Sequence, residues 1–470
     1  MGLILSISLC SSNPNAKEKI GDQIEGHWEG IVSFSGIQRN IFMDFFVDGN
    51  IRATISMPEQ DIKFIPVDNL VFEPPRLHFE LKGSNNDVQI FEGFLEKNNI
   101  RGTLTEGGYI LDVTLKRIHR KPERGEEYPG YSASKFRQYI NIHRNQAVIE
   151  ISKVFELYNI AIAITDYGLA KFINRKDQYC QDVLKHFLPF KKHALISKVE
   201  FSQEKFYEYL NLRTTSFFYD MKNGRLLKKD FLPATNFNDE MVHLIESFAK
   251  ETDFELFYRQ HESYYQQQIE SYQGMVPVTK MWLWLENQFS IKYDSYIIII
   301  SPLTVEANNT KRIDLEGSKL CLMFVSSPNS GNGVNKALTE AGMSRAVFTE
   351  INHNYVNPIT DLYLTQVNEA LVDLSQWNDD QKTKNVYNSA YATINEYLTW
   401  AVYLLYAYDY YDNLTFKDIV NRVNRQMDKS RGFVRFSSFS EFCLELYRNK
   451  PNDKKISDLF PEMIQWFRVQ

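Results

Sequence analysis

The 470-residue sequence contains no long apolar run, and this absence bears on whether the chain crosses a membrane. No stretch reaches the roughly 18 consecutive apolar residues that indicate a transmembrane helix. The most apolar short run, Ile297–Ile300, is typical of a buried strand. The sequence therefore predicts no transmembrane span.

An excess of positive charge and an abundance of cysteine are also missing. The net charge is −6 and the pI is about 5.9, so the chain offers no electrostatic reason to expect nucleic acid as a partner. Cys180, Cys321 and Cys443 lie far apart and form neither a C-x-x-C metal pattern nor a dense disulfide framework. We expect isolated buried thiols at these three positions.

The N-terminus has a short apolar stretch followed by small residues, which is typical of the end of a signal peptide. No basic segment precedes it, which indicates a truncated or mis-assigned start. We therefore predict a signal-peptide remnant or disorder over residues 1–20 and export to the periplasm or the medium. A lipid anchor at Cys10 is disfavoured, because Leu9 is bulkier than that cleavage site normally tolerates.

Apolar and aromatic residues are plentiful, at 43% and 14%, which supplies material for large cores and argues against disorder. A chain of this length predicts more than one domain. Residues 24–118 alternate apolar and polar positions, and a turn at residues 48–50 joins two such runs, which predicts a hairpin. We expect a small antiparallel β-barrel or sandwich here, followed by a charged linker over residues 119–131.

Residues 132–470 read as mainly helical with a few strands, so the fold class is α+β and multidomain. Ile149, Val154, Leu157 and Ile160 recur near helical spacing. The other expected elements are helices over 239–250 and 280–287 and strands over 293–301 and 320–325.

The segment Thr349–His353 reads T-E-I-N-H, a zinc-hydrolase H-E-x-x-H motif whose first histidine is threonine. In the complete motif two histidines hold zinc on one helix face, and the glutamate handles protons of the attacking water. A helix over 342–355, ended by Pro358, would place Glu350 and His353 on the same side. A glutamate three residues before a histidine also occurs at Glu240, so a surface or packing histidine is the default interpretation.

A second glutamate, Glu396, lies within the apolar segment 391–406. A helix that is apolar on both sides is buried, and a buried carboxylate is costly unless it is paired or bound to a metal. We therefore expect Glu396 to have either a metal or a lysine or arginine as its partner.

Together these segments resemble an uncharacterised bacterial family of zincin-like predicted metallopeptidases, grouped as a domain of unknown function. The resemblance covers about residues 135–470 and extends to four further segments, 155–160, 165–168, 301–303 and 431–433. Residues 24–118, near whose start stands Gly26-His27-Trp28-Glu29-Gly30, resemble a lipocalin-like β accessory domain fused to exported bacterial hydrolases.

The resemblance implies that Glu350 handles protons and that His353 and Glu396 are zinc ligands. Thr349 departs from the pattern at the first ligand, whereas catalytic zinc normally has three protein ligands and a water. Asn352 or Asp361 could stand in for the missing ligand.

Three functions fit these observations, and whether the chain is an enzyme stays open. The first is a degenerate homologue that binds a peptide or protein without a working zinc site. The second is an active zinc peptidase that uses Glu350 as general base, with His353, Glu396 and an unidentified third ligand. The third is a glycan- or surface-binding protein that uses its 27 tyrosines and 33 phenylalanines.

Overall fold

The chain forms two compact units, residues 1–131 with 233–236, and residues 132–232 with 237–470. The computed structural model describes residues 21–34, 37–47, 51–57, 62–82, 88–106, 109–118, 133–166, 173–175, 177–200, 206–229, 236–305, 308–315, 317–326, 335–379, 387 and 389–470. The expected signal-peptide remnant, Cys10 and the linker over 119–131 lie outside these residues. Export therefore stays a prediction.

The first unit is an antiparallel β-sheet, as the alternating pattern predicts. Its strands are β1 (Gly26–Phe34), β2 (Ile37–Val47), β3 (Ile51–Met57), β4 (Ile62–Pro66), β5 (Asp68–Glu73), β6 (Arg76–Lys82), β7 (Val88–Glu96), β8 (Asn99–Glu106) and β9 (Tyr109–Ile118).

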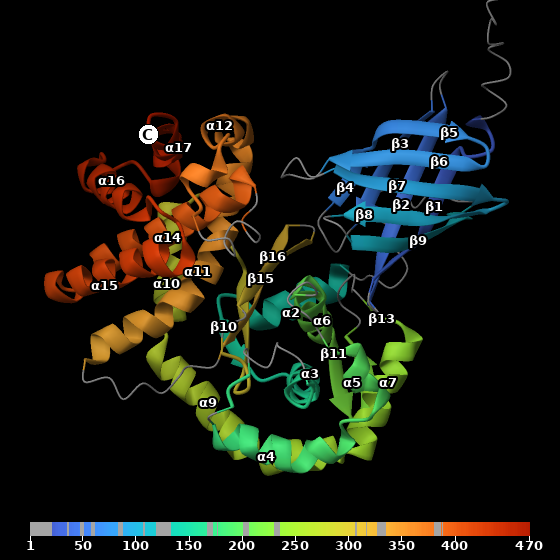
Figure 1. The fold of residues 1–470 in the computed structure, drawn as a ribbon, viewed down its shortest axis with the longest axis horizontal. Helices are drawn as coiled ribbons and strands as arrows, with labels where there is room; N and C mark the ends of the chain where they lie inside the picture. The colour runs from blue at the N-terminus through green and yellow to red at the C-terminus, as the bar shows by residue number, and fades with distance from the viewer. Residues whose placement is uncertain are drawn as a thin grey trace, which may run out of the picture. The chain divides into compact units, whose positions relative to one another are not determined.

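The strand order closes this sheet nearly into a barrel (Figure 1). Hydrogen-bonded neighbours run β4-β3-β2-β1-β9-β8-β7-β6-β5. Strands β4 and β5 follow each other directly, and the intervening Val67 donates its N–H to the carbonyl of Ala53 on β3 at 3.1 Å. The continuous segment β4–β5 thus pairs with β3 at its beginning and with β6 at its end, which brings the two edges of the sheet together.

Inward-facing side chains of the barrel strands form one apolar core. Trp28 is 1% exposed, and its indole N–H donates to the Ile24 carbonyl at 2.9 Å. Phe79 and Phe91 on neighbouring strands stack with ring centroids 4.5 Å apart. The period of two in the sequence therefore corresponds to one face packed in the barrel and one face outside it.

The second unit contains a sheet of order β10-β14-β16-β15. The strands β10 (Ala147–Glu150), β14 (Ser295–Ser301) and β16 (Ser318–Ser326) run parallel, and β15 (Asn309–Leu315) pairs antiparallel with β16 at the edge. Every residue of β14 is buried, as expected from its run of four isoleucines. The unit also contains the short antiparallel strands β11 (Tyr219–Lys222) and β12 (Arg225–Lys228), whereas β13 (Asn236–Phe237) begins in the segment 233–236 that belongs to the first unit.

Helices make up most of the second unit. Those before β14 are α2 (Ala133–His143), α3 (Lys153–Ala163), α4 (Gln178–Phe187), η3 (Leu188–Phe190), α5 (Ala194–Lys198), α6 (Phe206–Ser216), α7 (Asp239–Glu251), α8 (Phe254–Gln260), α9 (Glu262–Met275) and α10 (Val278–Gln288). Those after β16 are α11 (Lys336–Leu362), α12 (Leu364–Ala370), η5 (Leu374–Gln376), α14 (Ala390–Tyr410), α15 (Asn413–Arg425), the π-helix η6 (Gln426–Arg431), α16 (Phe436–Asn449), η7 (Ile456–Leu459) and α17 (Phe460–Arg468).

Several sequence expectations are confirmed in this unit. Helices α7 and α10 and strands β14 and β16 lie where the patterns predict them. Cys180, Cys321 and Cys443 are free and buried. Within the described residues, no helix combines the length and the hydropathy needed to span a bilayer.

Two expectations are wrong. Ile149, grouped with the helical positions, lies in β10, because a short apolar run does not distinguish a buried strand from a helix. Pro358 does not end α11, which continues to Leu362. Proline lacks the N–H that would bond the carbonyl of Asn354, and the Tyr293 hydroxyl donates to that carbonyl instead at 2.8 Å.

Candidate functional site

Helix α11 packs on β15, β16 and α14, and it carries most of the candidate residues (Figure 1). Its N-terminus is capped by Asn335, whose side chain accepts from the N–H of Leu338 at 3.1 Å. Arg345, Thr349 and His353 follow one another at four-residue spacing and therefore line one face of the helix.

Helix α14 is buried from Thr393 to Ala407, as its two apolar sides predict, and several hydrogen bonds join it to α11. The side-chain amide of Asn352 donates to the Thr399 carbonyl at 2.9 Å. The Tyr403 hydroxyl donates to the Ala341 carbonyl at 2.9 Å. These bonds set the two helices side by side and bring Glu396 to the face of α11 that carries His353.

His353 is half-buried between the two helices. Its Nδ1 lies 3.2 Å from the side-chain oxygen of Asn357 and 3.3 Å from the hydroxyl of Thr399. An Nδ1–H that donates to Asn357 leaves Nε2 as an acceptor. The ring is therefore oriented by α11 and α14 together.

Glu350 is half-buried, and among the described residues none hydrogen bonds to its carboxyl group. Burial raises the pKa of Glu350 to about 7, although the nearby His353, Arg213 and Arg431 favour the ionised form. Glu396 adds to the increase as a like charge. A carboxyl group that titrates near neutrality can give or take a proton at physiological pH.

Glu396 has an arginine as its partner, one of the two possibilities expected from its burial. Arg431 donates through Nη2 to Oε1 at 3.2 Å and through Nη1 to Oε2 at 3.3 Å. The Tyr387 hydroxyl donates to Oε1 at 2.6 Å and itself accepts from Arg431 at 2.6 Å. Burial raises the pKa of Glu396, but Arg431, His353 and the Tyr387 hydrogen bond outweigh it and hold this pKa at about 2.

The π-helix η6 delivers Arg431 to this position. It ends at Gly432, whose φ of +76° is left-handed and favours glycine. The Gly432 carbonyl accepts from the N–H of Asp379 at 2.9 Å, which fixes the backbone next to Arg431. Single π-helical turns are frequent at functional sites.

These residues do not fit a catalytic zinc site. The Thr349 hydroxyl donates back to the Ala346 carbonyl of its own helix at 3.1 Å, and both Glu396 oxygens already accept hydrogen bonds. The side-chain N–H of Asn352 donates to the backbone of α14, while its Oδ1 is buried with no hydrogen-bond partner among the described residues, and Asp361 is exposed. Within the described part of the chain, no three histidine, cysteine or acidic side chains are placed to share a metal ion.

The structure thus brings Glu350, His353 and Glu396 together and adds residues that the sequence pattern did not identify. Arg431 belongs to a segment that contributed to the resemblance, but nothing assigned it to Glu396, which is 35 residues away. No sequence pattern indicated that Tyr387 or Arg345 belongs to this site. A search for basic residues able to neutralise Glu396 would have included Arg431 among many candidates.

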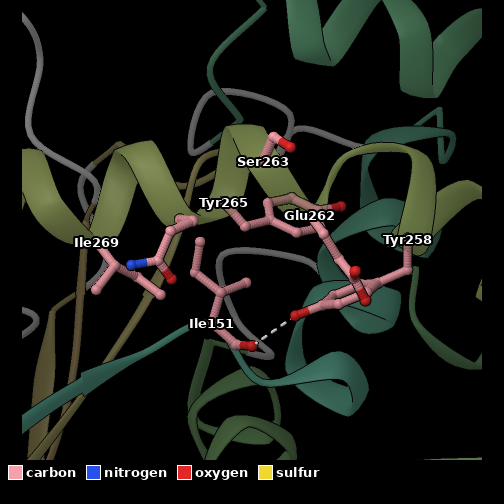
Figure 2. A pocket seen from close by; sticks show the side chains of 7 residues that line it. Ile151, Tyr258, Glu262, Ser263, Tyr265 and Ile269 are labelled. Atoms are coloured by element: carbon pink, nitrogen blue, oxygen red, sulfur yellow. Dashed lines mark hydrogen bonds between the residues drawn. The ribbon is translucent and has the colours of Figure 1, made fainter.

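A separate cavity of about 600 Å³ lies beside α9 (Figure 2). Figure 2 shows the Tyr258 hydroxyl on one wall, where it donates to the Ile151 carbonyl at 2.8 Å. Tyr265, another lining residue, shares a hydrogen bond with Tyr179 at 2.7 Å, and Tyr179 donates to the fully buried Glu156 at 2.7 Å. Burial raises the pKa of Glu156 to about 7, against the hydrogen bonds from Ser301 and Tyr179. A buried acid therefore stands behind this cavity.

Residues 227–466 match the model of a protein family described as a domain of unknown function, DUF4932. No curated protein and no solved structure matches the chain.

Proposed function

Because the chain belongs to the DUF4932 family, whose description assigns no activity, we propose a function from the chemistry of its α11–α14 site. The proposal is a zincin-like protein that has lost its zinc and binds a peptide or protein at this site without hydrolysing it. The zincin-like part rests on the resemblance of the T-E-I-N-H segment and of Glu396 to that family's metal site.

One observation carries the proposal, namely the triad of Glu396, Arg431 and Tyr387. To coordinate a metal, Glu396 must give up Arg431, and separating a buried ion pair costs roughly 3–5 kcal/mol. The position of Thr349 supplies only a hydroxyl that is already bonded to Ala346. Glu396 is occupied by Arg431, and the first zinc histidine is replaced by Thr349. Both features oppose zinc binding.

The remaining polar groups suit hydrogen bonding to a peptide. The Glu350 carboxyl has no hydrogen bond from any described residue, and His353 is oriented through one ring nitrogen only. A backbone amide offers a donor and an acceptor at every residue, so it can pair with either group.

A zinc-dependent peptidase is the second candidate, and one observation favours it. A carboxyl group with a pKa of about 7 beside a histidine is suited to act as a general base at neutral pH. This function requires zinc to compete with Arg431 for Glu396. The third function considered, glycan or surface binding, has no observation in this site that favours it.

Zinc stoichiometry of the full chain tests the proposal. The parent and a His353→Ala variant are dialysed, loaded with excess zinc, desalted and analysed for metal. We expect far less than one zinc per chain in both proteins. About one zinc in the parent and none in the variant would contradict the proposal. Peptidase assays would then be the next experiment.

A second experiment restores the missing first ligand and frees Glu396. Thr349→His combined with Arg431→Leu rebuilds the first ligand and frees Glu396, so this double variant should bind zinc if the alignment with the zincin pattern is correct. Thr349→His alone should bind more weakly, since Arg431 still occupies Glu396. Failure of the double variant, when folded, would remove the zincin assignment itself.

A further inference from the structure

Two arginines share one tryptophan beside this site. The Cζ atom of Arg345 lies 4.6 Å from the centroid of the Trp400 ring, and that of Arg431 lies 4.9 Å from it. Trp400 is 4% exposed, so the indole is held by packing while the two guanidinium groups approach it. We name this arrangement the Arg345–Trp400–Arg431 stack. Guanidinium groups stack favourably on indole rings.

The two arginines differ in their partners. Arg431 has its bidentate carboxylate, Glu396. Arg345 is half-buried, and among the residues that the structure describes no carboxylate forms an ion pair with it. Burial lowers the pKa of Arg345, and Arg431 acts in the same direction as a like charge. Arg345 is therefore a partly desolvated cation that has no carboxylate partner among the described residues.

Among the described residues, one carboxylate acts on both arginines of the stack. Glu396 is the carboxylate that acts on both arginines, and it is already bonded to Arg431. Among the described residues Arg345 is thus left without an ion pair of its own, and a partly buried charge is costly until it is paired.

We propose that Arg345, held on Trp400 beside Arg431, binds a carboxylate group of the peptide or protein that occupies the α11–α14 site. This inference rests on the proposed function and names the chemical group that is recognised. The planar guanidinium presents two parallel donors that match the two oxygens of a carboxylate. A single carboxylate suits a chain of net charge −6, whereas a polyanion would be repelled by it. The carboxylate belongs either to a C-terminus or to an acidic side chain.

Synthetic peptides distinguish these sources. The full-length protein is titrated with tri-alanine, with tri-alanine amide, and with N-acetyl-Ala-Glu-Ala-amide, and binding is followed by intrinsic fluorescence. Trp400 lies in the stack, so the part of the signal that disappears in a Trp400→Phe variant reports this site. We expect saturable binding of tri-alanine or of the glutamate peptide, which identifies the source, and no binding of tri-alanine amide.

Arg345→Gln should weaken that binding at least tenfold, and Arg345→Lys should weaken it less, because lysine keeps the charge but loses the fork. Arg422→Gln on the exposed face of α15 is the matched control and should change nothing. Should Arg345→Gln fail to fold, Arg345→Lys carries the test. Any of three results would overturn the inference. Tri-alanine amide could bind as tightly as the carboxylate peptides, neither carboxylate peptide could bind, or both Arg345 variants could keep the affinity of the parent.

The zinc measurement keeps this inference separable from the proposed function. If the parent is free of zinc and binds neither carboxylate peptide, the carboxylate site is contradicted but the loss of zinc is not. If the parent holds about one zinc per chain, the proposed function is contradicted, regardless of the peptide-binding results.

Discussion

At the scale of single residues, Arg431 decides what Glu396 can do. We predict that Arg431→Met destabilises the protein by about 3 kcal/mol at pH 7, because it leaves a buried carboxylate with only the Tyr387 hydroxyl. Adding Glu396→Gln should recover most of this loss, since the charge is then gone. Urea unfolding of the two variants and the parent measures both changes. A single variant as stable as the parent would mean that water already solvates Glu396.

Glu350 gives a prediction about pH. Its pKa is about 7 in the folded chain, above the ordinary value of 4.5, so the folded state holds the proton more tightly than the unfolded state does. The contribution of Glu350 to the free energy of unfolding is therefore greatest below pH 4.5, and it is lost as the pH rises through 7. Glu350→Gln should therefore stabilise the protein by roughly 1–3 kcal/mol at pH 8 and much less at pH 4.5. Thermal unfolding at both values checks this.

The matched control for that experiment is Glu441→Gln, which removes an exposed carboxylate from α16. Its effect on the unfolding temperature should be small and alike at both pH values. A Glu350→Gln variant that behaves as this control does would show that the Glu350 carboxyl is well solvated in the folded protein.

At the scale of elements, the length of α11 depends on one bond from outside the helix. Tyr293→Phe should cost about 1–2 kcal/mol, because the Asn354 carbonyl then has no donor. With Pro358→Ala in place, the alanine N–H reaches that carbonyl, and the same change should cost about 1 kcal/mol less. Unfolding free energies of the four proteins form the double-mutant cycle. Equal costs in both backgrounds would mean that the Tyr293 bond does not replace the missing helical one.

This helix also shows what local sequence can and cannot give. The hairpins of the barrel and the buried helix α14 were predictable, because alternation and two-sided apolarity are local patterns. So was the need of Glu396 for a partner, which follows from burial alone. The identity of that partner was not predictable, since Arg431 arrives from a π-helix 35 residues later. Nor was the continuation past Pro358, which depends on Tyr293, 61 residues upstream of the accepting carbonyl.

At the scale of the whole molecule, the barrel and the helical unit have separate cores. The barrel core gathers around Trp28 and the strands β1–β9, whereas the site residues pack among α11, α14 and η6. Compact units with their own cores unfold independently unless a large interface couples them. The chemistry of Glu350, His353 and Arg345 should accordingly survive damage to the barrel.

Trp28→Ala tests this independence. Removing a fully buried tryptophan costs about 3–5 kcal/mol, and here it also deletes the bond to Ile24. Hydrogen exchange followed by mass spectrometry should show faster exchange across β1–β9, with α11 and α14 as protected as in the parent. Phe348→Ala, which removes a fully buried side chain of α11, should give the opposite pattern. If α11 and α14 lose protection together with the barrel in Trp28→Ala, the two units unfold as one, and the barrel is part of what holds the Glu350 site in place.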